Sequence, residues 1–186
     1  VGNNAGAHGD SATALGNGAS ATNTQATAIG SGSAASGSYA IAMGNGSSST
    51  DSSTIAIGNG AGAHGDYATA MGSGSSATSP QSTAIGSGAG AHETYATALS
   101  SGSSATTSYS TAIGGGASAG GGNATALGYN AKANNSYATA LGNNAKSNAS
   151  GGIALGSNST VYRGSGTTGL DPRTGKAYTD TSDKIW

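Results

Sequence analysis

The stretch Ser136–Gly156, SYATALGNNAKSNASGGIALG, contains ATALG and then, fourteen residues later, IALG. The same phase runs through most of the chain: a Leu, Ile or Met recurs every fourteen residues, Ala always precedes it, and Gly follows it in every copy but one, where Ser100 stands. The eleven apolar residues are Leu15, Ile29, Met43, Ile57, Met71, Ile85, Leu99, Ile113, Leu127, Leu141 and Leu155. Such a fixed period indicates one structural unit per repeat, stacked on its neighbours.

With the apolar residue numbered 0, the repeat predicts an extended unit. Each copy contains several Gly and Ser and has no second apolar heptad position, which argues against a coiled coil. Thr-Ala-Leu and Thr-Ala-Ile alternate as a short strand does. Position +3 is always Gly or Asn, which predicts a left-handed turn residue there. These residues are Gly18, Gly32, Gly46, Gly60, Gly74, Gly88, Gly102, Gly116, Asn130, Asn144 and Asn158. Because Ser100 is accepted at position +1, we expect a weaker need for Gly there.

Positions +4 and +6 are almost always Ala or Ser, so a second short strand with a small inward face follows the turn. The sequence therefore predicts an all-β parallel β-roll, a solenoid of 14-residue coils that rise about 4.8 Å each. We expect the Leu/Ile side to point into the roll and the Ala/Gly side to face partner chains, although the pattern is also compatible with the reverse. The apolar core looks small for the number of residues that it orders, so we expect an oligomer.

Composition excludes several classes of protein. Of 186 residues 34% are hydrophobic and 7% are charged, and Cys is absent, which rules out disulfides and Cys-based metal sites. Residues 1–131 contain no Lys or Arg, and the six basic residues that follow are too dispersed for a nucleic-acid interface. No apolar run is long enough to span a bilayer and no signal-peptide pattern opens the chain. For a protein at a membrane or outside the cell, we therefore expect targeting and anchoring segments outside this sequence.

Two of the units carry a family resemblance. Residues 82–89, STAIGSGA, and 152–159, GIALGSNS, resemble the head repeat N-S-V-A-I-G-x-x-S of the YadA-like trimeric autotransporter adhesins. The resemblance covers residues 1–160 and implies a left-handed β-roll assembled as a homotrimer. It implies a cell-surface virulence protein on the extracellular side of the outer membrane of a Gram-negative bacterium, with its membrane anchor outside this fragment. It also implies attachment to host cell-surface receptors or extracellular matrix, such as collagen, fibronectin or laminin, and self-aggregation. The alternative is a structural spacer or self-association module without a host ligand.

The chain departs from the family pattern at two positions. Thr replaces the Val of the motif in most copies, and the leading Asn is mostly Tyr, Gln or Ser. The resemblance therefore predicts matrix attachment as a class and no particular ligand. Residues 161–186 lose the phase and are interpreted as an irregular connector, with a turn at residues 171–175, toward a following head, neck or Trp-bearing module at Trp186.

Two sets of side chains form the candidate contact surface. Five tyrosines share position −4, where a stripe of exposed rings could bind protein or could instead shield the start of the strand. They are Tyr39, Tyr67, Tyr95, Tyr109 and Tyr137. Lys132 and Lys146 are in phase on adjacent coils and form either a small positive site for acidic polysaccharide or a solvated edge.

Other patterns indicate no chemistry. His8, His64 and His92 all fall at position +7, two or four coils apart, too far to share a metal, so we interpret them as solvated turn residues. A Thr ladder at position −2 is also typical of ice-binding solenoids, which are the structural rival. Ser is plentiful, but no arrangement with His and Asp is visible. We expect no enzyme activity, catalytic residue, metal or cofactor.

Overall fold

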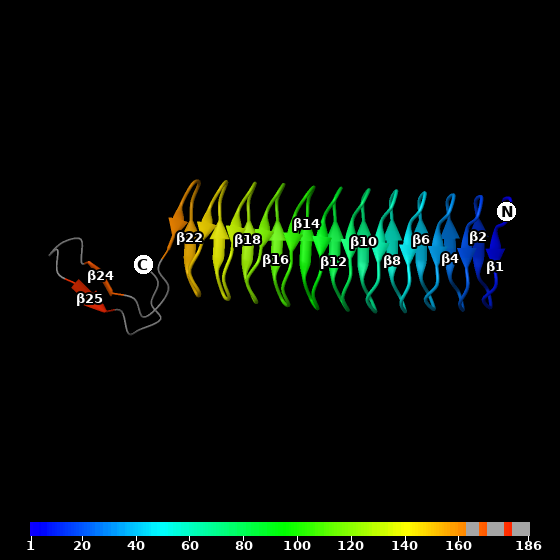
Figure 1. The fold of residues 1–186 in the computed structure, drawn as a ribbon, viewed down its shortest axis with the longest axis horizontal. Coiled ribbons are helices and arrows are strands. Elements are labelled where there is room, and N and C mark those ends of the chain that lie inside the picture. Colours follow the sequence, from blue (N-terminus) through cyan, green and yellow to red (C-terminus); the bar gives the residue numbers. More distant parts are fainter. Residues whose placement is uncertain (163–167, 171–176, 180–186) are drawn as a thin grey trace.

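The computed structural model describes residues 1–162, 168–170 and 177–179. Two parallel sheets face each other, and each coil of the chain contributes one strand to each sheet, so the coils follow one another as a straight column (Figure 1). We call the 12-stranded sheet of odd-numbered strands, β1 to β23, sheet A, and the 11-stranded sheet of even-numbered strands, β2 to β22, sheet B. This arrangement confirms the parallel β-roll with 14-residue coils.

The strands are short. Those of sheet B hold three residues: β2 (Thr13–Leu15), β4 (Thr27–Ile29), β6 (Ile41–Met43), β8 (Ile55–Ile57), β10 (Thr69–Met71), β12 (Thr83–Ile85), β14 (Thr97–Leu99), β16 (Thr111–Ile113), β18 (Thr125–Leu127), β20 (Thr139–Leu141) and β22 (Ile153–Leu155). Those of sheet A hold two residues: β1 (Gly6–Ala7), β3 (Ser20–Ala21), β5 (Ala34–Ala35), β7 (Ser48–Ser49), β9 (Gly62–Ala63), β11 (Ser76–Ala77), β13 (Gly90–Ala91), β15 (Ser104–Ala105), β17 (Ser118–Ala119), β19 (Lys132–Ala133), β21 (Lys146–Ser147) and β23 (Thr160–Val161).

Backbone hydrogen bonds join each coil to the next, so that residues fourteen positions apart lie side by side. Strand β14 pairs with β16 so that Thr97 lies beside Thr111 and Leu99 beside Ile113. The Thr97 amide donates to the Ser110 carbonyl over 2.9 Å. The turns are joined in the same way, since the Gly102 amide donates to the Ser87 carbonyl over 2.9 Å. Each residue therefore repeats above its counterpart fourteen positions away.

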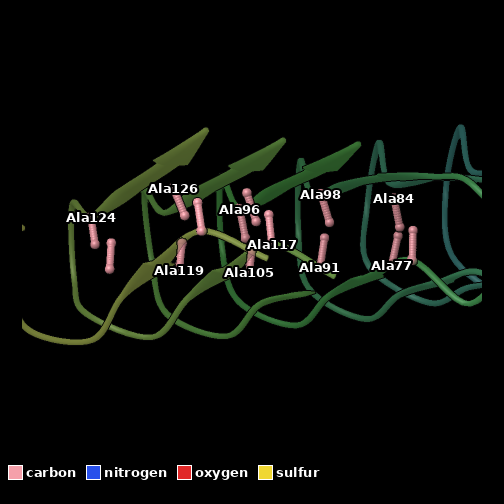
Figure 2. Packing of buried hydrophobic residues seen from close by; sticks show 14 of the residues in the cluster. Ala77, Ala84, Ala91, Ala96, Ala98, Ala105, Ala117, Ala119, Ala124 and Ala126 are labelled. Atoms are coloured by element: carbon pink, nitrogen blue, oxygen red, sulfur yellow. The ribbon is translucent and has the colours of Figure 1, made fainter. Parts of the chain in front are cut away.

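The interior of the roll is built of methyl groups. Inward positions −3 and −1 of sheet B and +4 and +6 of sheet A are Ala in most coils, and these alanines are fully or almost fully buried. Figure 2 shows Ala91 of sheet A and Ala98 of sheet B pointing toward each other, and Ala77 and Ala84 doing the same one coil earlier. In the described part of the chain the largest fully buried side chain is that of Thr54.

The expectation that the Leu/Ile side points into the roll is wrong. The eleven position-0 side chains lie on the outer face of sheet B, and Met43, Ile85 and Leu127 are 37%, 38% and 40% exposed. Successive strand residues face opposite sides, so only one set of Thr-Ala-Leu can point inward. The inward side chains of sheet A are Ala or Ser, and a fourteen-residue coil closes tightly enough that only equally small groups fit opposite them. The set Leu15, Ile29, Met43, Ile57, Met71, Ile85, Leu99, Ile113, Leu127, Leu141 and Leu155 is thus an outer file and not the core of the single chain.

Most buried hydroxyl groups are paired locally, and Thr107 Oγ1 is the exception among the described residues. The Ser33 hydroxyl donates to the Gly30 carbonyl over 2.9 Å, which satisfies a hydroxyl at position +4 within its own turn. Where Ser49 replaces Ala at position +6, its hydroxyl donates to Thr54 Oγ1 over 2.8 Å, and Thr54 in turn donates to the Asp51 carbonyl over 2.7 Å. A buried hydroxyl with a partner costs little, so Ser and Thr replace Ala here without opening the roll.

Glycine is favoured for different physical reasons at position +3 and at position +1 of the turn. Every residue predicted at position +3 has positive φ, from 54° at Asn130 to 65° at Gly18, and a Cβ added at Gly74 would meet nothing within 4 Å. At position +1 the prediction of a weaker need is wrong. Gly72 has φ 130°, and a Cβ there would lie 2.6 Å from the backbone carbonyl of Gly86 in the next coil. Ser100 is accommodated with φ 104°, well below its neighbours at this position.

Beyond the roll, β24 (Thr168–Leu170) and β25 (Ala177–Thr179) pair antiparallel. The turn predicted at residues 171–175, between two short extended pieces, lies outside the described residues, as does Trp186.

Substituting the two glycines of one turn tests this difference. Gly74→Ala is expected to lower the free energy of unfolding by about 1–2 kcal/mol, because only the left-handed backbone is strained. Gly72→Ala is expected to cost about 1–3 kcal/mol more, because its methyl group also collides with the next coil. Urea unfolding followed by circular dichroism measures both, and equal losses would contradict the assignment. Gly74→Asn, which copies the residue found at Asn130, is the tolerated control.

Candidate contact surfaces

Three of the outward surfaces of the roll carry the candidate contact residues. Sheet B shows the residues at positions −2 and 0, sheet A shows those at +5 and +7, and the turn that leads from sheet A back to sheet B shows position −4. Because every coil has the same backbone, each position forms a straight file of side chains along the roll, about 4.8 Å apart.

The outer face of sheet B is apolar and flat. Its position-0 file contains only Leu, Ile and Met, and beside it runs a file of Thr, replaced by Ile at Ile41, Ile55 and Ile153. The Thr ladder therefore shares its face with the apolar file, and it is bordered by side chains that cannot hydrogen-bond to water or ice. A contiguous apolar file of this length on the outside of a roll indicates a contact face.

The turn before sheet B carries the tyrosines. We call Tyr39, Tyr67, Tyr95, Tyr109 and Tyr137 the tyrosine ridge. All five are exposed, from 44% for Tyr95 to 67% for Tyr137. Both interpretations of these rings, as a protein-binding stripe and as a shield for the start of the strand, stay predictions.

Each ridge tyrosine has a left-handed backbone, with φ between 59° and 61°. Sequence reasoning missed this second turn residue because Tyr, Gln and Ser rarely signal positive φ. The signal was present in Asn123 and Gly151, which stand at the same position and accept that conformation readily.

The ridge rings stack where two occur on consecutive coils. The centroids of Tyr95 and Tyr109 are 5.0 Å apart and their planes are inclined by 14°. Gln81, one coil earlier, donates from Nε2 to the hydroxyl oxygen of Tyr95 over 3.3 Å. The ring planes therefore lie across the long axis of the roll, and the ridge is an incomplete column of stacked groups.

Sheet A has a mostly small, polar outer face. Lys132 and Lys146 lie side by side in β19 and β21, with Lys146 the more exposed. Near them Asn134 donates to Asn148 and Asn130 donates to Asn144, so amide ladders line this end of the roll. The two lysines are thus brought together as the spacing predicts, on neighbouring strands of sheet A.

The three histidines lie in separate places along the edge of sheet A. Each ring covers the glycine two residues before it: a Cβ added at Gly62 would lie 2.7 Å from Nε2 of His64, and one at Gly90 would lie 2.5 Å from Nε2 of His92. This contact explains why His occurs here in the context Gly-Ala-His. His64 Nδ1 also lies 3.1 Å from the Thr50 hydroxyl of the preceding coil.

Within residues 1–162 and the two short strands that follow, no group of three or more His, Cys, Asp or Glu residues could hold a metal ion. In the same part of the chain, no helix is long and apolar enough to cross a membrane.

Comparison with known proteins places this geometry in a family. The YadA head domain repeat, described as two copies, matches residues 7–33, 35–61, 63–89, 119–145 and 133–159, which together make up more than half of the 186 residues. A search of curated proteins found no match. The matched segments are the coils whose period, small interior and paired turn residues are described above. The chain belongs to the YadA head family, whose domains are of the surface-adhesin type.

Proposed function

We propose that this roll is the head of a bacterial surface adhesin that assembles as a homotrimer through the outer face of sheet B. In this arrangement the apolar file of each chain turns toward the three-fold axis, and the tyrosine ridge and sheet A remain available for ligands. The head attaches its cell to host extracellular matrix or cells, and it promotes aggregation of like cells.

The apolar file is the observation that carries the proposal. A Leu, Ile or Met stands at the same outward place on every strand of sheet B, and these side chains remain a third or more exposed in many coils. The single chain buries only small side chains in its interior, so its hydrophobic stabilisation per residue is low. Covering the file would add the large apolar side chains that the interior lacks.

Cyclic symmetry fits the shape of this face. The strands of sheet B are all parallel and in register, so the file is straight and runs the length of the roll. Three parallel rolls can bring the same file to one axis, where every copy makes the same contacts along its whole length. The neighbouring Thr side chains can hydrogen-bond at the rim of such a contact.

The family membership also supports a proposal for the location. We place the head on the extracellular side of the outer membrane of a Gram-negative cell, held by an anchor outside this sequence. A rigid roll suits this role because backbone hydrogen bonds join each coil to both neighbours, so a contact surface is held at a fixed distance from the cell.

The second candidate is a structural spacer or self-association module without a host ligand. The sparse charge of the surface favours it, since residues 1–131 carry only four acidic groups and no Lys or Arg. The two candidates share the trimer and differ in what the outward surfaces contact.

Charged substitutions on the apolar file test the trimer. Ile85→Asp and Ile113→Asp, made together, are expected to weaken association about a thousandfold, because each places an unpaired charge in the contact. Both side chains already face outward, so the coil itself keeps its fold. Sedimentation equilibrium of wild type is expected to give three times the chain mass, and the variant the mass of one chain.

The control uses the other sheet. Ser76→Asp and Ser104→Asp occupy equivalent outward places two coils apart on sheet A, and this double variant is expected to keep the trimer mass. A trimer that survives the sheet B substitutions, or one that is lost with those of sheet A, would remove the proposed contact face.

Adhesion separates the two candidates. Wild-type head is expected to be retained on a surface coated with collagen, fibronectin or laminin, and the Ile85→Asp/Ile113→Asp variant about a hundredfold less, because three linked copies bind more tightly than one. Surface plasmon resonance measures both. If wild type is retained on none of the three coatings, the spacer is the better reading.

A further inference from the structure

The tyrosine ridge has gaps of a defined size. Stacked rings on consecutive coils are 5.0 Å apart, as Tyr95 and Tyr109 show. Tyr39 and Tyr67 are separated by one coil that carries Ser53 at the ridge position, and their places are therefore about 10 Å apart. The space between such rings accommodates one further planar ring.

The same gap occurs three times. Asn123 separates Tyr109 from Tyr137 as Ser53 separates Tyr39 from Tyr67. Gln81 separates Tyr67 from Tyr95 and partly fills its gap through the hydrogen bond to the Tyr95 hydroxyl. We call the ridge positions of Ser53, Gln81 and Asn123 the slots.

The tyrosines of one copy match the slots of a second copy when the two ridges run antiparallel. If a second copy lies antiparallel with its Tyr95 opposite the first, the tyrosines of each copy, Tyr95 excepted, face a residue that is not tyrosine. The facing pairs are Tyr137 with Ser53, Tyr67 with Asn123, Tyr109 with Gln81, Tyr39 with Gly151, and Tyr95 with itself. Other reversed registers that engage all five tyrosines set more of them against each other. This register therefore fills every slot with a ring.

The charge distribution favours the same direction. Residues 1–131 carry only acidic groups, and every Lys and Arg comes later. In the reversed register the coil of Asp51 faces the coil of Lys132, because Ser53 of one copy meets Tyr137 of the other. A parallel pair in register would set every acidic coil against its own copy, whereas the reversed register does so only for the coil of Glu93, which meets its copy at the two-fold axis. Complementary charge thus selects the antiparallel pair.

We propose that the tyrosine ridge is a homotypic contact, in which a second copy of this head lies antiparallel and the rings of each copy enter the slots of the other. The contact is isologous, with its two-fold axis at Tyr95. It deepens the proposed function and rests on it for one point: heads that project from two facing cells approach each other antiparallel. The ridge then supplies the self-association, and the sheet B face supplies the trimer.

Removing rings tests the contact. Tyr67→Asn and Tyr137→Asn, made together, are expected to weaken the doubling of the lowest-mass species at least about tenfold, since each lost ring empties one slot of the other copy. The fold should tolerate both changes, because Asn123 occupies the same position with φ 55°. Tyr129→Asn with Tyr162→Asn, two exposed tyrosines away from the ridge, is the control and should leave the doubling unchanged.

Filling the slots distinguishes insertion of rings into the slots from nonspecific association of exposed aromatic side chains. Ser53→Tyr and Asn123→Tyr complete the column within one chain and add exposed aromatic surface. If rings of the second copy enter the slots, these variants should also weaken doubling at least about tenfold. Unchanged or stronger doubling in these variants overturns the proposal.

Cross-linking tests direction, and the chain has no Cys to interfere. With a short bis-maleimide, Tyr95→Cys is expected to link two heads. Tyr39→Cys is expected not to, because antiparallel copies place residue 39 of one about 38 Å from residue 39 of the other. Raising the salt from about 0.1 M to about 0.5 M should weaken doubling in wild type, because the facing charges are then screened.

Sedimentation equilibrium over a concentration series keeps the two proposals distinguishable. The molecular mass at the lowest concentration shows whether the chain is a trimer. The doubling of that mass at higher concentration shows whether heads associate through the tyrosine ridge. Absence of doubling in wild type overturns the ridge contact whatever the dilute mass is. Ridge variants that lose retention on matrix-coated surfaces but still double would likewise overturn it, in favour of a host partner.

Discussion

The size of the interior governs everything else in this molecule. Two strands per coil face each other across a space that accepts methyl groups and little more, as the paired alanines of sheets A and B illustrate (Figure 2). Because the interior is filled by Ala, Ser and an occasional Thr, larger side chains lie outside, except for the partly buried Val161 at the end of the roll. Surface features that would be unusual in a globular protein, such as a long file of Leu, Ile and Met, follow directly from this limit.

The turns also depend on small residues at fixed positions. A fourteen-residue coil has to reverse direction twice within a few residues, and it does so with a positive-φ residue at position −4 in one turn and at positions +1 and +3 in the other. The glycine at +1 lets one coil approach the next to within hydrogen-bonding distance, as in the bond from the Gly86 amide to the Met71 carbonyl over 2.7 Å. Close stacking of coils and close packing of sheets are therefore both consequences of small residues at fixed places.

Much of this could be predicted from the sequence. The period, the parallel stacking, the two strands, the turn at +3 and the small inward face of sheet A all follow from residue types whose backbone preferences are strong. The direction of the apolar side chains could not, because Thr-Ala-Leu alternates equally well in either orientation. The deciding clue was that two facing strands must match in size: Ala91 can meet Ala98 but leaves no room for Leu99. Tyr67 and its equivalents were recognised as a surface, although their left-handed backbone was not, since tyrosine seldom adopts it.

Equal coils have a genetic consequence. Neighbouring repeats carry the same residue types at the strand and turn positions, and each is bonded to the next in the same way, so loss or duplication of one fourteen-residue unit leaves every remaining residue on its own face. The head can therefore lengthen or shorten in steps of about 4.8 Å without any compensating substitution. The order of residues along a file does change in such an event. Reach can thus vary freely between related strains, whereas the pattern that a file presents to a partner is altered each time a unit is gained or lost.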